Sequence, residues 1–143
     1  MTKIIDILYI EDNLDHVLFV TKALKKINEN INVISVDNGR EALAMLKRFD
    51  QEDSVLPKLI LLDLNMPGLS GLDILKEVKA DEDLKLIPIT MFSTSDSEED
   101  VKRSASLGAN AYVVKPSGYQ KLVECLSQIC GFWLKTNQVT LAH

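Results

Sequence analysis

Several features that mark specialised classes of protein are missing from this chain of 143 residues. No apolar stretch approaches the roughly 20 residues that a membrane span needs, and the N-terminus lacks the basic-then-apolar layout of a secretory signal. Cysteine is scarce: Cys125 and Cys130 lie about 140° apart around a helical pattern, so they form neither a disulfide nor a metal pair. We therefore expect a cytoplasmic protein with no membrane contact and with reduced, buried thiols.

Positive charge is also in short supply, because 16 Lys and Arg residues stand against 21 Asp and Glu residues, for a net charge of −5. A nucleic-acid surface would show a basic stripe, whereas Lys25-Lys26 and Lys102-Arg103 are isolated pairs on helical patterns. Neither His16 nor His143 has metal-ligand spacing around it, so we expect both on the solvated surface. The composition favours one soluble globular domain and argues against nucleic acid as a partner.

Short apolar runs alternate with stretches of helical period, which is typical of βα units around a parallel sheet. Right-handed crossovers then favour an α/β fold with a doubly wound, five-stranded parallel sheet in the flavodoxin-like order 2-1-3-4-5 and helices on both faces. One domain, 1–134, is expected, with a C-terminal tail at 135–143 and no second domain after it. Strands are predicted at about 4–10, 31–36, 58–62, 87–92 and 110–114, and helices at about 14–29, 38–49, 71–80, 96–107 and 118–134.

Reactive side chains follow four of these predicted strands. Glu11-Asp12 comes after the first strand, Asp63 after the third, Ser93 after the fourth and Lys115 after the fifth. The carboxyl ends of parallel strands meet at one edge of the sheet, and the strand order reverses between the first and third strands. We therefore predict that three carboxylates, a hydroxyl and an ammonium group gather in one site at that edge.

The charge of this predicted site points to a metal ion. Three carboxylates cannot lie together fully ionised without positive charge, because like charges raise each other's pKa values. A dication with oxygen ligands would supply two positive charges and Lys115 one, and Mg²⁺ is the natural choice. The lack of paired His or Cys ligands disfavours zinc, and 12–15 does not continue as a calcium loop.

An aspartate in such a site can act as a nucleophile toward a phosphoryl donor. Phosphorylation of Asp63 would change its charge from −1 to about −1.5 to −2, and Ser93 and Lys115 could answer by moving toward the new anion. One hydrogen bond to a charged group contributes about 1.5 to 3 kcal/mol, whereas a complete switch needs about 5.5 kcal/mol. We therefore predict a concerted change of Ser93, Lys115 and the adjoining loops.

These residues resemble the receiver domains of two-component response regulators, and the resemblance extends from Ile4 to about Ile129. Asp63 lies 30 residues before Ser93 and 52 before Lys115, which is similar to the usual separations in that family. The segments that carry the resemblance are the acidic pair at 11–13, the phosphoacceptor block at 61–68 with Gly71, and the lysine-proline signature at 114–116.

The resemblance implies that Asp63 accepts a phosphoryl group from the phosphohistidine of a sensor histidine kinase or phosphotransfer protein. It also implies that the chain is not an enzyme, apart from Mg²⁺-dependent self-phosphorylation and autodephosphorylation. The implied metal ligands are Glu11, Asp12, Asp63 and the backbone carbonyl of Asn65.

The switch implied by the resemblance consists of the Ser93 hydroxyl and the aromatic ring of Tyr112, with Lys115 assisting at the phosphoryl group. The resemblance further implies a cis bond between Lys115 and Pro116. The chain departs from the common pattern in two ways, since its acidic pair is Glu-Asp instead of Asp-Asp and Ser93 stands where Thr is more frequent. Asn65 and Ser95 line the path of attacking water in related domains, so the phosphoryl lifetime is not predicted.

The implied partners are the kinase and a downstream protein, because no output domain follows the receiver pattern. The ending at 131–134, which contains Phe132 and Trp133, and the long loop before Pro57 resemble single-domain regulators that are paired with phytochrome kinases. Family analogy also allows a homodimer through the fourth or fifth helix and the last strand. The sequence does not name the stimulus or the downstream target.

Three other functions remain open. A phosphatase of the haloacid dehalogenase type also uses an aspartate nucleophile with Mg²⁺, but it places a second Asp where this chain has Asn65. A flavodoxin-like electron carrier needs an anion-friendly loop after the first strand, and Glu11-Asp12 would repel the phosphate. A receiver that is never phosphorylated and serves only for docking is the third, and the complete set of site residues argues against it.

Overall fold

The computed structural model describes residues 4–51 and 56–138. Within these ranges, five parallel strands form one sheet in the order β2-β1-β3-β4-β5, which confirms the predicted topology. The strands are β1 (Ile7–Ile10), β2 (Val33–Val36), β3 (Leu59–Leu62), β4 (Ile89–Ser93) and β5 (Ala111–Val114).

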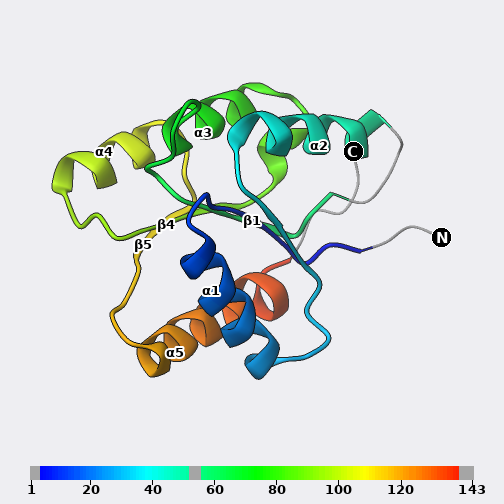
Figure 1. Ribbon diagram of the computed structural model, residues 1–143. Coiled ribbons are helices and arrows are strands. Elements are labelled where there is room, and N and C mark those ends of the chain that lie inside the picture. Colours follow the sequence, from blue (N-terminus) through cyan, green and yellow to red (C-terminus); the bar gives the residue numbers. More distant parts are fainter. Residues whose placement is uncertain (1–3, 52–55, 139–143) are drawn as a thin grey trace.

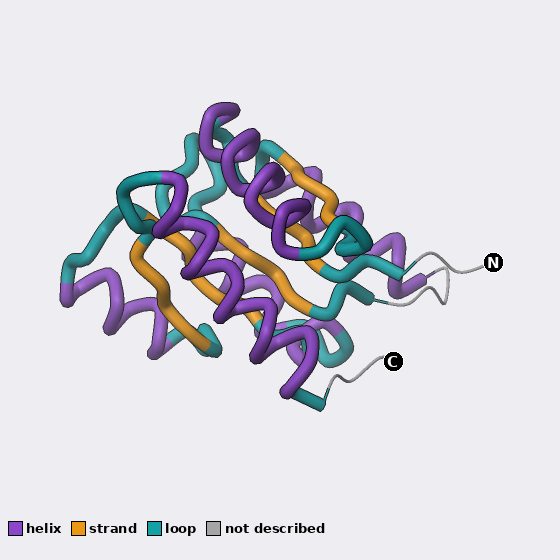
Figure 2. The backbone as a smooth tube through the Cα atoms, turned by 90° about the horizontal axis from the view of Figure 1, so that it is seen from below, coloured by secondary structure: helices purple, strands orange, loops and turns teal. Residues whose placement is uncertain are grey.

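Helices cover both faces of this sheet, as predicted, and Figure 1 shows α1 and α5 below it and α2, α3 and α4 above it. Seen from below in Figure 2, helices cross in front of the strands. No helix in the described ranges is long and apolar enough to cross a membrane. The helices are α1 (Leu14–Ile27), α2 (Gly39–Gln51), α3 (Gly71–Ala80), α4 (Glu98–Ser106) and α5 (Tyr119–Cys130), with a short 3-10 helix η1 (Leu84–Leu86) and a π-helical turn η2 (Gly131–Thr136).

The central strands are buried on both faces because successive side chains of a strand point to opposite sides. On β1, Leu8 and Ile10 contribute to the core between the sheet and helices α2 and α3. Ile7 and Tyr9 contribute to the core between the sheet and helices α1 and α5. The edge strands β2 and β5 are only partly buried. This difference explains why the apolar runs in the sequence are longest at the strands that lie in the middle of the sheet.

Several predicted boundaries differ from the structure. The first strand starts at Ile7 instead of residue 4, and the fifth helix changes at Gly131 into the π-helical turn. The turn η1 was not predicted; its backbone is stabilised locally by Asp81, whose side chain accepts hydrogen bonds from the amides of Asp83 and Leu84. Such short-range caps leave little hydrophobic periodicity in the sequence. The predicted tail is described only as far as residue 138.

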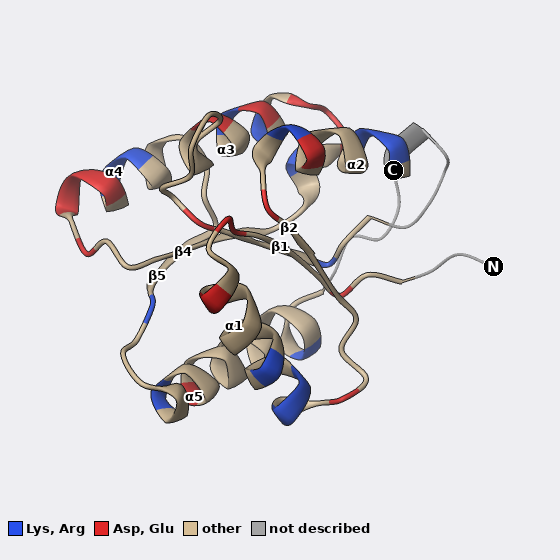
Figure 3. Cartoon of the chain, in the orientation of Figure 1, with Lys and Arg blue, Asp and Glu red and all other residues tan. Residues whose placement is uncertain are grey.

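Charged side chains gather at helix ends where they favour the helix dipole. The first turn of α4 carries Glu98, Glu99 and Asp100, and the last turn of α1 carries Lys25 and Lys26. Figure 3 shows these acidic and basic groups on separate helices. This arrangement agrees with the expectation that the basic pairs lie on solvated helix faces.

The two cysteines are both free. Cys130 is buried in the core between the sheet and helices α1 and α5, and burial raises the pKa of its thiol to about 11. Cys125 is half-buried against the same core, so the prediction of buried thiols holds fully for Cys130 alone.

Candidate functional site

Three carboxylates meet at the carboxyl edge of the central strands. Glu11 directly follows β1 and is 1% exposed, Asp63 directly follows β3 and is 7% exposed, and Asp12 lies beside them with greater exposure. One carboxylate oxygen from each residue lies within 4.8 Å of the others. The structure therefore brings together the acidic residues that the sequence had placed at the ends of two different strands.

The loop after β3 is folded tightly against Asp63. The Asp63 amide donates to the carbonyl of Ile10 at 3.0 Å, and the Gly71 amide donates to the carbonyl of Leu64 at 2.9 Å. A Cβ atom on Gly71 would lie 2.1 Å from the Asp63 carbonyl oxygen, so only glycine allows this approach. Asn65 is exposed in the same loop, two residues after Asp63.

Lys115 brings a positive charge into the site from the end of β5. Its side chain is 7% exposed, and its ammonium group donates to Glu11 Oε1. The same nitrogen lies 3.8 Å from Asp63 Oδ1. The Lys115 amide also donates to the carbonyl of Ser93 at 2.7 Å, which ties the two predicted site residues together through the backbone.

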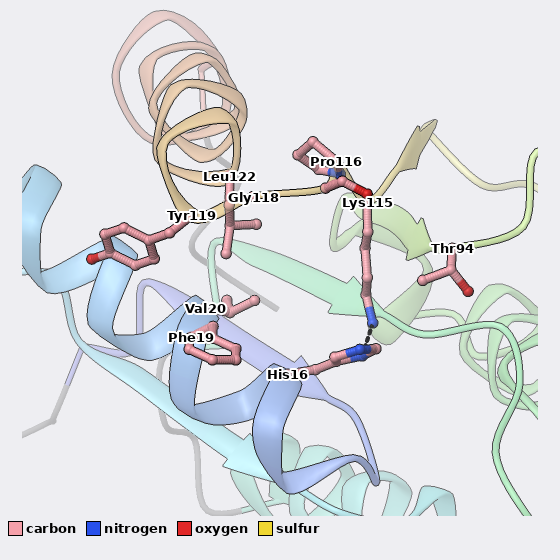
Figure 4. Close-up of a pocket in the computed structure, with 10 residues that line it drawn as sticks. His16, Phe19, Val20, Thr94, Lys115, Pro116, Gly118, Tyr119 and Leu122 are labelled. Atoms are coloured by element: carbon pink, nitrogen blue, oxygen red, sulfur yellow. Dashed lines mark hydrogen bonds between the residues drawn. The ribbon is translucent and has the colours of Figure 1, made fainter.

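His16 lies at this site with 37% of its side chain exposed, so the predicted solvated position holds only in part. The same prediction for His143 lies outside the described residues. The Nδ1 atom of His16 accepts a hydrogen bond from Lys115 Nζ at 2.9 Å, as Figure 4 shows. The same nitrogen lies 3.4 Å from Glu11 Oε1.

Asn13 caps α1 by accepting from the amides of Asp15 and His16, which places His16 in the first turn of the helix. The packing of α1 against the sheet then brings His16 to Lys115, and the predicted helix start at 14 did not reveal that contact.

The prediction of a cis bond before Pro116 is also wrong, because the described residues contain no cis peptide bond. The trans form of such bonds is favoured by about 0.5 to 1 kcal/mol. Lys115 reaches Glu11 with this bond in the trans form.

The pKa values of the two buried carboxylates are shifted in opposite directions. Burial alone would raise the pKa of Glu11, but the hydrogen bond and charge of Lys115 outweigh it and hold that pKa below its ordinary value. Burial raises the pKa of Asp63 to about 7, because the attraction of Lys115 is too weak at 3.8 Å to offset burial and the negative charge of Glu11. One lysine thus keeps Glu11 ionised, and Asp63 has no comparable positive charge to offset its burial.

Both predicted switch residues hold the loop between β4 and α4. Ser93 is fully buried, and its Oγ accepts from the Ser95 amide at 3.2 Å. The Tyr112 hydroxyl donates to the carbonyl of the same Ser95 at 2.8 Å. The Ser95 hydroxyl in turn donates to Asp100 Oδ2 at 2.6 Å, so a movement of Ser93 or Tyr112 would change hydrogen bonds that reach α4.

Phe132 and Trp133 lie in the π-helical turn, away from the carboxylates. Their rings pack edge to face with centroids 4.8 Å apart. Trp133 is half-buried against the core between the sheet and helices α1 and α5, whereas Phe132 is 49% exposed. Trp133 therefore covers the end of the core.

Residues 7–127 match the response regulator receiver domain family. The chain is similar to the response regulator Rcp1 of Synechocystis sp., with 37% identity over 131 residues that cover 91% of this chain and 89% of Rcp1. It is also similar to the probable methanogenesis regulatory protein FilR2 of Methanothrix harundinacea, with 30% identity over 92% of this chain and 85% of FilR2.

Solved structures show the same likeness in three dimensions. The phosphorylated cyanobacterial phytochrome response regulator RcpA superposes with a TM-score of 0.86 at 34% identity, over 96% of this chain and 99% of that chain. The Mn²⁺-bound form of Rcp1 gives a TM-score of 0.82 at 36% identity, over 94% and 97% of the two chains. The acidic site, the strand order and these matches agree, and the chain belongs to the response regulator receiver domain family.

Proposed function

We propose that this protein accepts a phosphoryl group on Asp63 in a two-component phosphorelay and then changes its surface for a downstream protein partner. The observation that carries the proposal is the meeting of Glu11, Asp12 and Asp63 within 4.8 Å, with Lys115 beside them. In this role the chain is a signalling protein, and its only catalytic steps are Mg²⁺-dependent self-phosphorylation and autodephosphorylation.

Mg²⁺ is the proposed cofactor of this site. The raised pKa of Asp63 supports this proposal, because Lys115 does not offset the burial of both carboxylates and a hard dication with oxygen ligands would supply further positive charge. Glu11, Asp12, Asp63 and the Asn65 carbonyl would hold it, and its charge would stabilise the phosphoryl oxygens during transfer. The similar protein Rcp1 was solved in an Mn²⁺-bound form, which supports a divalent metal here.

Transfer forms a bond between an Asp63 carboxylate oxygen and phosphorus and breaks the bond between phosphorus and a nitrogen of the donor histidine. The imidazole leaves with the electron pair of the broken bond and takes up a proton. Lys115 Nζ, at 3.8 Å from Asp63 Oδ1, is close enough to move onto the new phosphoryl group as a point charge.

The surface change follows from the added charge. The Ser93 hydroxyl would turn toward the phosphoryl group, and its present hydrogen bond with the Ser95 amide would weaken. The Tyr112 hydroxyl is bound to the Ser95 carbonyl, so loop and ring would move together. One such hydrogen bond contributes about 1.5 to 3 kcal/mol, less than a full switch needs, and the movement is therefore concerted.

A groove of about 400 Å³ beside the site is the proposed approach for the phosphodonor. As Figure 4 shows, His16 and Lys115 lie at one end of this groove, and the apolar side chains of Phe19, Tyr119 and Leu122 come from α1 and α5. The proposed donor is a sensor histidine kinase of the phytochrome type, because RcpA, which has the same fold, is a phytochrome response regulator.

We also infer a homodimer through β5 together with α4 or α5, on family analogy. Val101 on α4 and Val114 on β5 are exposed apolar side chains on these elements. Sedimentation velocity of the parent and of a Val101→Asp, Val114→Asp double variant tests it: the parent should sediment as a dimer and the variant as a monomer. A monomeric parent at tens of micromolar would exclude this dimer.

The test of phosphorylation is incubation with a small phosphodonor and Mg²⁺, followed by mass spectrometry of the intact protein. The parent should gain the mass of one phosphoryl group, and Asp63→Asn should gain none. Chelation of the metal should also abolish the gain. A chain that instead turned over a chromogenic phosphate ester with multiple turnovers would be a phosphatase, and a chain unmodified by any donor would be a docking receiver.

A further inference from the structure

Tyr9 lies at the site although it was not among the predicted site residues. Its side chain is fully buried on β1, and its hydroxyl donates to Glu11 Oε1 at 3.2 Å. A phenyl ring would fill the same space without a hydroxyl, so packing alone does not account for a tyrosine here. The hydroxyl has its reason in the contact with Glu11.

Two donors share Oε1 of Glu11 in this structure. One is the Tyr9 hydroxyl and the other is the Lys115 ammonium, which also donates to His16. The second oxygen, Oε2, accepts from the backbone amide of Asn13 at 3.3 Å. Of the two donors on Oε1, Tyr9 is neutral and Lys115 is charged. This difference decides how each donor responds when a dication binds to Glu11.

Lys115 and a dication on Glu11 would repel each other, because two positive charges would share one carboxylate. Lys115 has another acceptor within reach, since Asp63 Oδ1 lies 3.8 Å from its Nζ. The Tyr9 hydroxyl is not repelled. Its hydrogen bond therefore contributes more to the orientation of Glu11 after Lys115 has turned to Asp63, because it no longer duplicates the hydrogen bond from Lys115.

We propose that Tyr9 is a positioning residue for Glu11, whose hydroxyl keeps Oε1 in place when Lys115 turns toward Asp63. This inference rests on the proposed Mg²⁺ site and adds a residue to its support. A tyrosine hydroxyl carries its proton at physiological pH, and here it points at Glu11 Oε1, so it acts as a donor to that oxygen. Tyr9 does not touch the reacting atoms, so its effect should lie in metal affinity and not in the transfer step.

The variant Tyr9→Phe removes the hydroxyl and keeps the ring. Isothermal titration calorimetry should show that the Kd for Mg²⁺ rises about fivefold, because a hydrogen bond to a charged ligand is lost. At saturating Mg²⁺ the rate of self-phosphorylation from a small phosphodonor should stay within about twofold of the parent. The rise in melting temperature at one fixed Mg²⁺ concentration should be smaller in the variant, by mass action.

Two controls separate this role from simple packing. Thr90→Val removes a buried hydroxyl on β4 that has no hydrogen-bond partner among the described residues, and should leave the Mg²⁺ affinity unchanged. In a Glu11→Gln background, Tyr9→Phe should cause no further change in Mg²⁺ affinity, because the two residues act through one contact.

A Tyr9→Phe protein with a lower melting temperature and the parental Kd for Mg²⁺ would overturn the inference and leave the proposed function intact. A weaker affinity that persisted in the Glu11→Gln background would also overturn it, because the effect would not pass through Glu11. A parent that bound no Mg²⁺ at millimolar concentration would overturn the metal site and the inference together, so the two failures are told apart.

Discussion

Charged residues of the same types lie at both ends of the parallel strands, the amino-terminal end and the carboxyl end, but they make different contacts there. Before the strands, Asp6 accepts from the Asn32 amide at 2.8 Å and pairs with Lys58 at 3.1 Å. After the strands, Glu11 and Asp63 are buried together and share Lys115. Charge is balanced within the pair of Asp6 and Lys58 at the first end and left unbalanced at the second, where a dication and a phosphoryl group could bind.

Two lysines show the same contrast. Lys79, at the end of α3, donates to the carbonyls of Lys85 and Ile87 and to Asn110 Oδ1 at 3.0 to 3.3 Å. These neutral acceptors join the starts of β4 and β5, and burial lowers the pKa of Lys79. Lys115 faces carboxylates instead. A lysine among neutral acceptors stabilises the fold, whereas a lysine among excess carboxylates is free to change partners.

The largest expected difference between the two ends of the strands is in phosphorylation of their aspartates. Asp63→Asn should abolish it completely, because the nucleophilic oxygen is lost. Asp6→Asn should be phosphorylated at the parental rate while losing about 1 kcal/mol of stability, because its pair with Lys58 is partly exposed. Intact-protein mass spectrometry and thermal unfolding measure the two effects. Phosphorylation of the Asp63→Asn protein would mean that another residue is the acceptor.

Replacement of the lysines should separate them by their response to metal. Lys115→Met leaves Glu11 buried without its partner and should destabilise the protein by about 3 kcal/mol, most of which millimolar Mg²⁺ should restore. Lys79→Met should cost about 1 to 2 kcal/mol that Mg²⁺ does not restore, because its acceptors are neutral. Urea unfolding with and without Mg²⁺ measures both. Equal restoration in both variants would contradict the comparison.

The pH dependence of stability should come from Asp63, at the carboxyl end of the strands. Asp63 titrates near 3.8 when unfolded and near 7 when folded, so the folded chain binds more protons between these values. Without Mg²⁺, this group therefore makes stability fall as the pH rises from about 4 to 7. At pH 8, Asp63→Asn should be more stable than the parent by on the order of 2 kcal/mol, from removal of a buried charge. A parent and variant with parallel stability curves over this range would exclude the raised pKa.

The smallest effect is expected at His16. His16→Ala removes one acceptor of Lys115 and leaves the contact with Glu11, so stability should fall by about 0.5 to 1.5 kcal/mol. His16→Asn should recover part of this loss, because an amide oxygen can also accept from Lys115. A loss that neither depends on Lys115 nor is recovered by Asn would show that His16 acts only through packing.

Much of the site could be predicted because its residues directly follow buried strands. Asp63 comes after four aliphatic residues, and Lys115 after the apolar end of another strand, so the parallel topology alone brings them to one edge. Tyr9 also carried a signal: it lies two residues before Glu11, and alternate residues of a strand share a face.

Contacts made between elements could not be predicted in the same way. His16 comes from the first turn of α1, and its distance from Lys115 depends on how that helix packs against the sheet. The Tyr112 hydroxyl reaches the Ser95 carbonyl 17 positions away along the chain, across a loop whose path the sequence does not reveal. Hydrophobic period identifies strands and helices, but it carries no information on which polar atoms face each other between them.

The sequence by itself determined the parallel sheet and its strand order, through the order of its apolar runs. It also determined where the carboxylates meet, because these residues directly follow the runs and every parallel strand ends on the same side of the sheet. The tertiary structure decided that Lys115 lies on Glu11 and His16 in preference to Asp63, and that the Tyr9 hydroxyl supports the same oxygen. These choices depend on small differences in distance among buried polar atoms, which are set by how the segments after β1, β3 and β5 and the first turn of α1 pack against one another.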